Sequence, residues 1–387
     1  MRQVLKRLER TLRHSTLFVL GLFFGRRTSE LAAPARIKRI LLIRSDRIGD
    51  AVLSTPVIQI LQQHMPHVVI DLVLGPKNGS VSDLMPFVKN VFVLNRGPLH
   101  FLSLIGRLRR FRYDVAIDML LNDSLTAAVL TIGSGASIRI GYQGSLSALY
   151  DRVLERPVKQ EHHVVTLLRL IAPFNIGVEA GSARLSINVP TLAIKTAQKM
   201  MSQVDKRCGP LVMVNISGSS PSKFWGVEPY SRVISELNAA GIGVMLMCSP
   251  RDRDLVTRIA SNTASQVAPD SDLTVVAALL SLADLVVTPD TSIVHIAAAL
   301  GKPVVDLVPA PHIGLQWGPW AVPHRVVTGV SSLRDINETE VLAAIYSLLT
   351  VVSPSIKREA DSRIVQLGLR TEPHAAMDPP NENGGPA

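Results

Sequence analysis

The sequence predicts an α/β fold of two doubly wound domains facing a cleft, and three observations support this prediction. From residue 39 onward, short apolar runs alternate with helical segments, as they do where helices cover parallel sheets. The alternation forms two series of similar size. Between them, near residues 175–195, the stretch GVEAGSARLSINVP has the turn residues typical of a junction between domains.

The strands within each series can be assigned because runs rich in Val, Ile and Leu are typical of strands buried on both faces. In the first series we expect strands at 39–43, 69–74, 91–94, 114–119 and 138–142, with helices at 101–111 and 123–132. After a helical stretch at 191–206, we expect strands at 211–216, 243–248, 283–288, 303–308 and 325–329. The predicted domains are therefore 36–185 and 186–355, with an arm at 1–35 and an extension at 356–387.

The N-terminal arm is strongly basic. Residues 1–44 contain eleven Lys or Arg, and their only acidic residues are Glu9 and Glu30. In residues 1–27 the basic side chains interleave with leucines at helical spacing, and the apolar run LFVLGLFF is well short of the ~20 residues of a spanning helix. We interpret the arm as an interfacial anchor on an anionic leaflet. A helix packed on the protein body, a cleaved signal peptide and a nucleic-acid-binding arm are the alternatives.

Bulk composition excludes several classes of protein. With 47% hydrophobic and 19% charged residues, the chain is not an intrinsically disordered protein. Cys208 and Cys248 are far apart and lack metal-ligand spacing, which disfavours a disulfide scaffold or a zinc site and fits a reducing compartment. The extension ends in TEPHAAMDPPNENGGPA, whose Pro, Gly and Asn residues predict disorder at its end.

In open α/β sheets, ligands bind beyond the carboxyl ends of the strands, so the loops after strands are candidate sites. The first such loop, in LLIRSDRIGD, contains Arg44, Asp46, Arg47, Gly49 and Asp50. One interpretation makes Asp50 a helix N-cap. A cap requires only one carboxylate, however, and leaves the other charges unexplained. We therefore favour a substrate site, in which Gly49 allows the sharp turn that presents Asp50.

Three loops of the second series suit a nucleotide. NISGSSPSKFW offers phosphate its hydroxyls, backbone N–H groups and Lys223, although an ordinary serine-rich turn is the alternative. TPDTSIVH begins a helix near Thr291, whose free N–H groups and dipole favour an anion. His295 lies one turn into that helix, and its two interpretations are a ligand contact and a buried packing residue. CSPRDRD places Asp252 where a carboxylate could bind ribose hydroxyls. Neither a Walker A sequence nor a GxGxxG fingerprint follows the first strand of either domain.

Taken together, these stretches resemble glycosyltransferase family nine, which includes the lipopolysaccharide heptosyltransferases. LLIRSDRIGDAVLSTPVI is similar to the family's opening strand and Gly-Asp loop, and SGSSPSKFW is similar to its donor loop. DTSIVHIAAALGKPVV resembles its Asp-Thr-Gly-x-x-His motif, and EHHVVTLLRLI is loosely similar to a histidine-led helix. The resemblance covers about residues 38–350 and implies a GT-B type fold of two Rossmann-like domains, the first for the acceptor and the second for the nucleotide sugar.

The resemblance also implies an activity, which is inverting, metal-independent transfer of a sugar, heptose from ADP-heptose, to a lipopolysaccharide-core or related glycan. It makes Asp50 the catalytic base. We further expect Arg44 and Arg47 to bind phosphate on a lipid-linked acceptor. The implied donor-binding residues are Ser219, Lys223, Asp252, Asp290, Thr291, Ser292 and His295. No metal, cofactor or nucleic acid is expected. The expected location is cytoplasmic, with the arm on the inner face of a bacterial inner membrane.

The chain departs from the family pattern in three loops. Ser292 replaces a usual Gly, which matters if that position needs a positive φ. Pro309 and Pro311 replace residues that have N–H donors. Met119 and Leu120 stand where Gln or Gly is usual. These departures motivate the alternative of a nucleotide-sugar-binding protein without transfer activity. A nicotinamide oxidoreductase is disfavoured by the missing glycine fingerprint.

Overall fold

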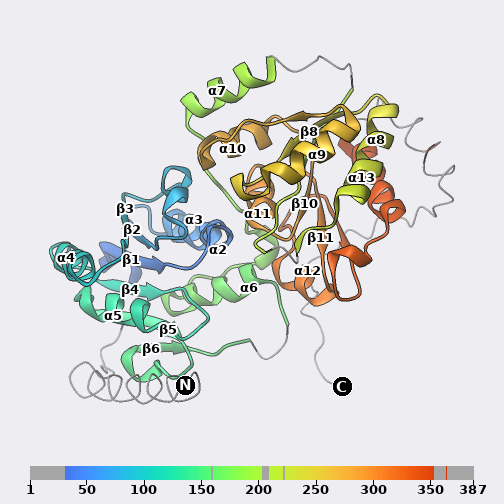
Figure 1. Ribbon diagram of the computed structural model, residues 1–387. Coiled ribbons are helices and arrows are strands. Elements are labelled where there is room, and N and C mark those ends of the chain that lie inside the picture. The colour runs from blue at the N-terminus through green and yellow to red at the C-terminus, as the bar shows by residue number, and fades with distance from the viewer. Residues whose placement is uncertain (1–30, 158–159, 203–208, 221–222, 353–362, 364–387) are drawn as a thin grey trace, which may run out of the picture. The chain divides into compact units, whose positions relative to one another are not determined.

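A computed structural model describes residues 31–157, 160–202, 209–220, 223–352 and 363 (Figure 1). The predicted membrane anchor in residues 1–27 and the predicted disordered end of the extension lie outside the described residues. The described chain divides into two compact units. Unit 1 takes residues 31–82, 86–157 and 164–178, and unit 2 takes residues 83–85, 160–163 and the described residues from 179 onward.

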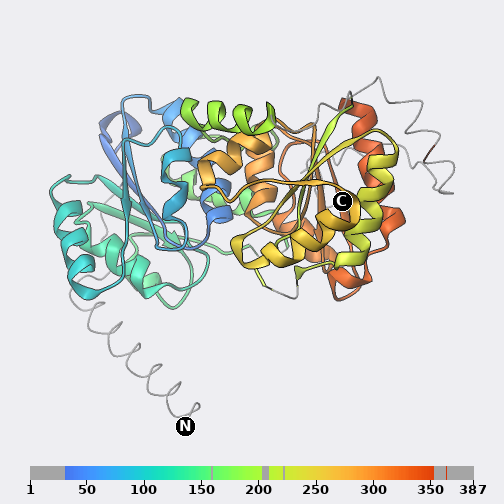
Figure 2. The same cartoon turned by 45° about the horizontal axis from the view of Figure 1, so that its top comes forward.

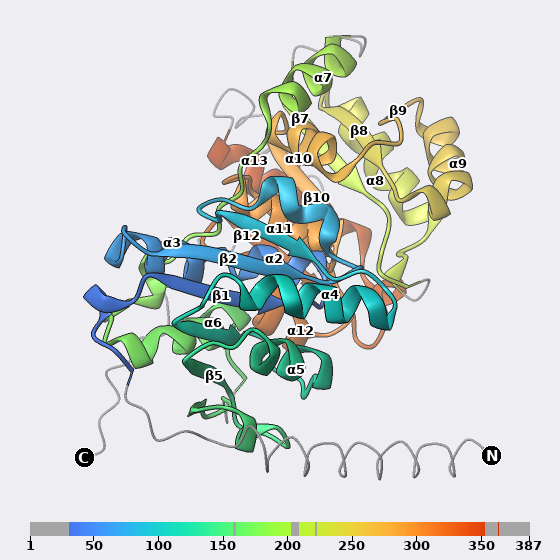
Figure 3. The ribbon, with the colours of Figure 1, turned by 90° about the vertical axis from the view of Figure 1, so that its left-hand side faces the viewer.

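Unit 1 is built on a parallel sheet of six strands in the order β3-β2-β1-β4-β5-β6. Its strands are β1 (Arg39–Arg44), β2 (Val69–Leu74), β3 (Asn90–Val93), β4 (Val115–Asp118), β5 (Ile138–Tyr142) and β6 (Arg152–Leu154). Its helices are α2 (Ile48–Leu53), α3 (Thr55–His64), α4 (Pro98–Arg109), α5 (Leu125–Gly133) and, apart from its first residue, α6 (His163–Leu168). Helices α4 and α5 lie together on one face of this sheet (Figure 3). Their buried leucine and alanine side chains belong to an apolar core of the unit.

Unit 2 is built on a second parallel sheet of six strands, in the order β12-β11-β10-β7-β8-β9. Its strands are β7 (Leu211–Asn215), β8 (Gly243–Met247), β9 (Gln266–Val267), β10 (Leu285–Pro289), β11 (Val304–Val308) and β12 (His324–Thr328). Its helices are α7 (Thr191–Ser202), α8 (Val227–Ala239), α9 (Arg253–Thr263), α10 (Leu273–Ser281), α11 (Ser292–Ala299), α12 (Pro311–Trp317) and α13 (Glu338–Val352).

The helices of unit 2 cover both faces of its sheet. Helices α9, α8 and α13 lie side by side on one face, over an extensive apolar core formed by buried residues of this unit (Figure 2). Helices α11 and α12 pack against strands β10 to β12, and α10 packs against α11. Because both faces are covered, the strands of this sheet are apolar almost throughout, as the sequence indicated.

The two sheets have the same connectivity. If the strands are numbered by their order within each unit, both sheets read 3-2-1-4-5-6, which is the Rossmann order. In this topology the chain reverses its direction of growth between strands 1 and 4, and ligands bind at the carboxyl ends of those strands. The switch points are therefore β1 beside β4 in unit 1 and β7 beside β10 in unit 2.

All the strands predicted from the sequence are present within two residues of their expected limits, and the predicted α/β class with two Rossmann-like units is confirmed. The sequence analysis missed β6 and β9. They are three and two residues long and are partly exposed, so neither has the apolar run that identified the other strands. No helix in the described ranges is both long enough and apolar enough to span a bilayer.

Candidate active-site residues

Asp50 lies at the carboxyl end of β1, on the first turn of α2. The chain leaves β1 at Arg44, and α2 begins at Ile48 with Arg47 as its N-cap. Asp50 is therefore the third residue of the helix, and the alternative in which it is the N-cap is wrong. The expected role of Gly49 is also wrong, because Gly49 lies inside the helix and is not among the residues with positive φ. The sharp turn is made before Gly49. A second helix, α3, starts at Thr55.

Arg44 is buried beneath Asp50. Its Nε donates to the Asp50 backbone carbonyl at 3.1 Å, and its Nη2 donates to Asp50 Oδ1 at 3.3 Å. Its Nη1 donates to the carbonyl of Met119, which follows β4, and Asp46 Oδ1 lies 3.4 Å from Nε. The Arg44 side chain has no exposed surface, so it does not face an acceptor as the sequence analysis expected. Arg47 is exposed.

The environment of Asp50 raises the pKa of its carboxyl toward neutral pH. Burial raises the pKa of the carboxyl to about 6, although Arg44 and Arg47 act to lower it. Asp46 adds a smaller contribution that raises it. Asp50 is only 9% exposed, yet its guanidinium partner stabilises the ionised form. The carboxyl can thus exchange a proton at slightly acidic to neutral pH.

A second carboxyl at the same switch point was not identified from the sequence. Asp118 ends β4 and pairs with Ile43 of β1. Its Oδ2 accepts a hydrogen bond from the Tyr150 hydroxyl at 2.6 Å, and its Oδ1 accepts one from the Leu120 N–H at 3.0 Å. Burial raises the pKa of Asp118 to about 7. In the sequence, the only feature that marks Asp118 as a candidate is its position at the end of a strand. Asp118 becomes part of this site because β4 lies beside β1 in the sheet.

In unit 2, the loops after β7 and β10 meet at the switch point. Lys223, from the loop after β7, donates through Nζ to the carboxylate of Asp290 and to its carbonyl oxygen, the latter at 3.2 Å. Asn215 Nδ2, at the end of β7, donates to Thr288 Oγ1 on β10 at 2.9 Å. The structure therefore brings together two predicted site residues, Lys223 and Asp290, which are separated by 67 positions in the sequence.

Helix α11 begins at this point. Thr291 is its N-cap, and the Thr291 hydroxyl accepts from the N–H of Ile293 at 3.3 Å. Among the described residues, nothing accepts a hydrogen bond from the N–H groups of Thr291 and Ser292. Ser292 is the first residue of the helix and does not have a positive φ, so replacing the usual Gly causes no backbone strain. Pro311 takes the first position of α12, where a proline is tolerated.

His295 is buried one turn into α11 and is 4% exposed. Burial lowers its pKa to about 3, and the proximity of His162 lowers it further, so the imidazole is neutral. Its Nδ1 has no hydrogen-bond partner within the described chain. The side chain therefore brings no positive charge to the start of α11.

The loops after β7 and β8 are tied together by Ser217, which the sequence analysis did not single out. Its hydroxyl oxygen accepts from the N–H of Ser249 at 2.8 Å. Asp252 accepts from the Ser249 hydroxyl at 3.0 Å and forms an ion pair with Arg251. Burial acts to raise the pKa of Asp252, but hydrogen bonds from Arg251, Ser217 and Ser249 hold it below its ordinary value. Ser219, the predicted phosphate contact, is exposed.

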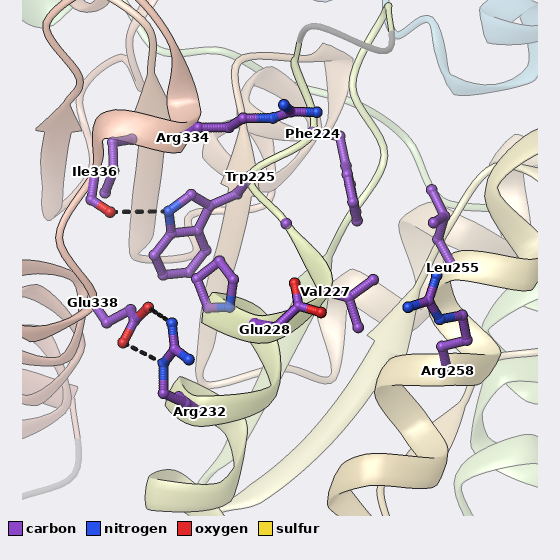
Figure 4. Close-up of a pocket in the computed structure, with 12 residues that line it drawn as sticks. Phe224, Trp225, Val227, Glu228, Arg232, Leu255, Arg258, Arg334, Ile336 and Glu338 are labelled. Atoms are coloured by element: carbon purple, nitrogen blue, oxygen red, sulfur yellow. Dashed lines mark hydrogen bonds and ion pairs between the residues drawn. The ribbon is translucent and has the colours of Figure 1, made fainter.

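Trp225 anchors the segment after Lys223 to the body of unit 2. Its Nε1 donates to the Ile336 carbonyl at 3.1 Å (Figure 4). Its ring also meets that of Tyr230 edge to face. A pocket of about 550 Å³ opens beside it, around the start of α8. Arg232 and Glu338 form an ion pair in this pocket. None of the predicted site residues line it, so we do not assign the donor to this pocket.

Asp306 is a further buried carboxyl near the switch point. It lies on β11 and pairs with Thr288 of β10. Both of its carboxyl oxygens are buried and have no hydrogen-bond partner in the described ranges. Burial raises its pKa well above the ordinary value, Asp290 raises it further, and Lys223 lowers it. Asp306 is therefore a buried carboxyl whose burial favours the protonated form, close enough to Asp290 and Lys223 for their charges to act on it. No group of three or more His, Cys, Asp or Glu in the described part of the chain is arranged to hold a metal ion.

Two parallel six-stranded Rossmann-like units define a protein of the GT-B type. The sequence profile described as Glycosyltransferase family 9 (heptosyltransferase) matches residues 101–341. The chain therefore belongs to glycosyltransferase family 9, and the protein is a glycosyltransferase.

Three similar proteins illustrate the range of relatives. Lipopolysaccharide heptosyltransferase 3 of Escherichia coli K12 is 26% identical over 347 residues, which cover 81% of this chain and 98% of the relative. A family 9 glycosyltransferase structure from Veillonella parvula has a TM-score of 0.73 at 21% identity, covering 84% of this chain and 99% of that one. The structure of E. coli ADP-heptose lps heptosyltransferase II has a TM-score of 0.67 at 22% identity, with coverages of 80% and 98%.

Proposed function

We propose that Asp50 is the general base of an inverting sugar transfer from a nucleoside diphosphate sugar to a hydroxyl of a glycan. The observation that supports this proposal is a buried carboxyl at the carboxyl end of β1, held by Arg44, with a pKa of about 6. Inversion requires a single displacement, in which a base removes the proton of the attacking hydroxyl. A base with this pKa is ionised at neutral pH and still accepts a proton readily.

The residues around Asp50 have distinct roles in this mechanism. Arg44 positions the carboxylate, because its guanidinium holds both the carboxylate and the backbone of Asp50. Arg47 is exposed and is the remaining candidate for a phosphate on the acceptor. Asp118 is 3% exposed, and the Tyr150 hydroxyl and the Leu120 N–H hold its two oxygens in place. We therefore give it the role of a charge that interacts with Arg44, and not that of the base.

Unit 2 holds the donor in this proposal. Lys223 exchanges its bond to Asp290 for the diphosphate, and the N–H groups of Thr291 and Ser292 bind the same anion at the start of α11. These cationic and dipolar groups stabilise the negative charge that develops on the leaving diphosphate, which is the reason for proposing a reaction without a metal. The exposed Ser219 and the neutral His295 complete the phosphate contacts, and Asp252 binds the ribose hydroxyls.

We propose heptose from ADP-heptose as the donor sugar, and the lipopolysaccharide core or a related glycan as the acceptor. The support is the matched family and the named activity of the relatives, which are lipopolysaccharide heptosyltransferases. The enzyme would then act at the cytoplasmic face of the inner membrane, with no nucleic-acid partner. A panel of nucleotide sugars tests the donor by thermal shift, with EDTA present to exclude a metal requirement. A shift with another nucleotide sugar and none with ADP-heptose would replace this assignment.

The catalytic assignment is tested with Asp50→Asn, which keeps the size of the side chain and removes its basicity. The transfer rate at saturating donor should fall by roughly 10²–10⁴-fold, the usual contribution of a positioned base. Donor affinity should stay the same, because the donor residues belong to unit 2. Asp46→Asn is the matched control and should keep a near-normal rate. A folded Asp50→Asn enzyme with a near-normal rate would exclude Asp50 as the base, and donor binding without turnover in the wild type would favour the binding-only alternative.

A further inference from the structure

Helix α4 has an outward face with exposed leucines. Leu104 and Leu108 point inward and belong to the core of unit 1. Leu99 and Leu102 are 79% and 62% exposed, and their spacing of three residues places them together on the opposite side of the helix. In Figure 3 the helix lies in front of the sheet of its own unit. Two leucines with so much exposed surface on one helix face indicate a contact surface.

The same segment is basic and has no acidic residue. Residues 86–113 contain Lys89, Arg96, Arg107, Arg109, Arg110 and Arg112, without any Asp or Glu. Arg107 lies over the Phe92 ring, 5.1 Å from its centroid, and Arg109 Nε donates to the Gly133 carbonyl at 3.1 Å. Arg96, Arg110 and Arg112 are exposed, and no carboxylate in the described chain forms an ion pair with them.

We propose that the α4 surface, defined as Arg96, Leu99, Leu102, Arg107, Arg110 and Arg112, docks the protein on an anionic lipid surface. Leu99 and Leu102 would enter the boundary between headgroups and acyl chains, while the arginines would remain at the level of the lipid phosphates. Leu99 and Leu102 lie on the outward face of α4, and Arg96, Arg110 and Arg112 lie at or just beyond the two ends of this helix. Exposed apolar side chains flanked by cationic ones are typical of interfacial binding.

Charge distinguishes the lipid surface from other occupants. Residues 1–30 contain seven Lys or Arg and two Glu, so the basic arm would be repelled by the α4 surface. A second copy of the same basic face would be repelled for the same reason. A nucleic acid would satisfy the arginines but would leave two leucines in water. The proposal depends neither on the roles given to Asp50 and Lys223 nor on binding by the arm.

The proposal is tested with the full chain and two kinds of vesicle, one of phosphatidylcholine alone and one of phosphatidylcholine with an equal amount of phosphatidylglycerol. One variant combines Leu99→Ser with Leu102→Ser, and the other combines Arg96→Gln, Arg110→Gln and Arg112→Gln. Helix α7 supplies matched controls, because it exposes 77% of Leu192 and also exposes Lys195 and Lys199. The controls are Leu192→Ser and the pair Lys195→Gln with Lys199→Gln.

In cosedimentation, the arginine variant should lose about a hundredfold in partitioning onto anionic vesicles, and the leucine variant about tenfold. Because the N-terminal arm is the same in the wild type and in every variant, it changes their partitioning by the same factor. The ratio of variant to wild-type partitioning is therefore independent of the arm. The α7 variants should bind as the wild type does. Melting temperature and nucleoside diphosphate affinity should be unchanged in all variants, which separates this proposal from the proposed function.

Two results of the vesicle measurements would overturn the proposal. One is wild-type partitioning of both α4 variants, and the other is an equal loss in the α7 controls, which would indicate nonspecific attraction of the whole charged protein. Binding of duplex DNA in the absence of vesicle binding would assign the surface to nucleic acid and would also refute it.

Discussion

Replacing Arg44 should move the pH dependence of the reaction, because Arg44 is the cation closest to the proposed base. In Arg44→Gln, Asp50 loses the charge 3.3 Å from its Oδ1. Removing an adjacent opposite charge raises the pKa of a carboxyl by at least about one pH unit. The wild-type rate should rise with pH through an inflection near 6, where Asp50 ionises. In the variant, the inflection should lie near 7 or above, so activity at neutral pH falls and returns at higher pH.

The same substitution should cost stability. Arg44 has no exposed surface and Asp50 is 9% exposed, so the change breaks a buried ion pair. Removing one partner of such a pair costs about 3–5 kcal/mol, and the low end applies here because Asp50 can still take up a proton. Urea unfolding at neutral pH measures this cost. The same measurement at other pH values gives the pH range in which the variant remains folded.

The assay is the rate at saturating donor and acceptor, measured across the pH range in which both proteins are folded. Arg47→Gln is the matched control, because Arg47 also lowers the pKa of Asp50 but is exposed and acts more weakly. Its inflection should move less than that of Arg44→Gln. An unshifted inflection in folded Arg44→Gln would refute the positioning role of Arg44, and a wild-type profile without an inflection near 6 would refute the role of Asp50.

Two further predictions concern unit 2. Lys223→Ala removes a charge-assisted contact with the diphosphate worth roughly 1.5–3 kcal/mol, so nucleoside diphosphate affinity measured by calorimetry should fall by about ten to a hundredfold. Lys195→Ala is its control, and equal affinities in both variants would place the phosphate site elsewhere. Asp306 has a raised pKa, so its stabilising contribution is lost as pH rises through that pKa. Asp306→Asn cannot ionise and should therefore gain unfolding free energy relative to wild type as the pH rises from 3.8, the ordinary pKa of an Asp carboxyl, into the alkaline range. A constant difference in urea unfolding across that range would show that Asp306 does not titrate.

The sequence by itself determined the architecture because a parallel sheet covered on both faces requires apolar strands. Runs such as VIDLVL and IRIGY coincide with β2 and β5, and the two series of runs became two Rossmann-like units. Strand ends also indicated the loops that contain Asp50, Lys223 and Asp290, since ligands bind beyond carboxyl ends. The short edge strands β6 and β9 could not be found in this way, because their pairing with a neighbour does not require an apolar run.

Only the tertiary structure decided what the charges in those loops do. Arg44 was expected to face an acceptor, but strand order places β4 beside β1, and the Met119 carbonyl and Asp50 together enclose its guanidinium. The same strand order makes Asp118 a neighbour of this site. In unit 2, the adjacency of β7 and β10 brings Lys223 to Asp290 across 67 positions. Periodicity specifies which face of a strand is buried, but which strands are neighbours is a long-range property that emerges only when the whole sheet has formed.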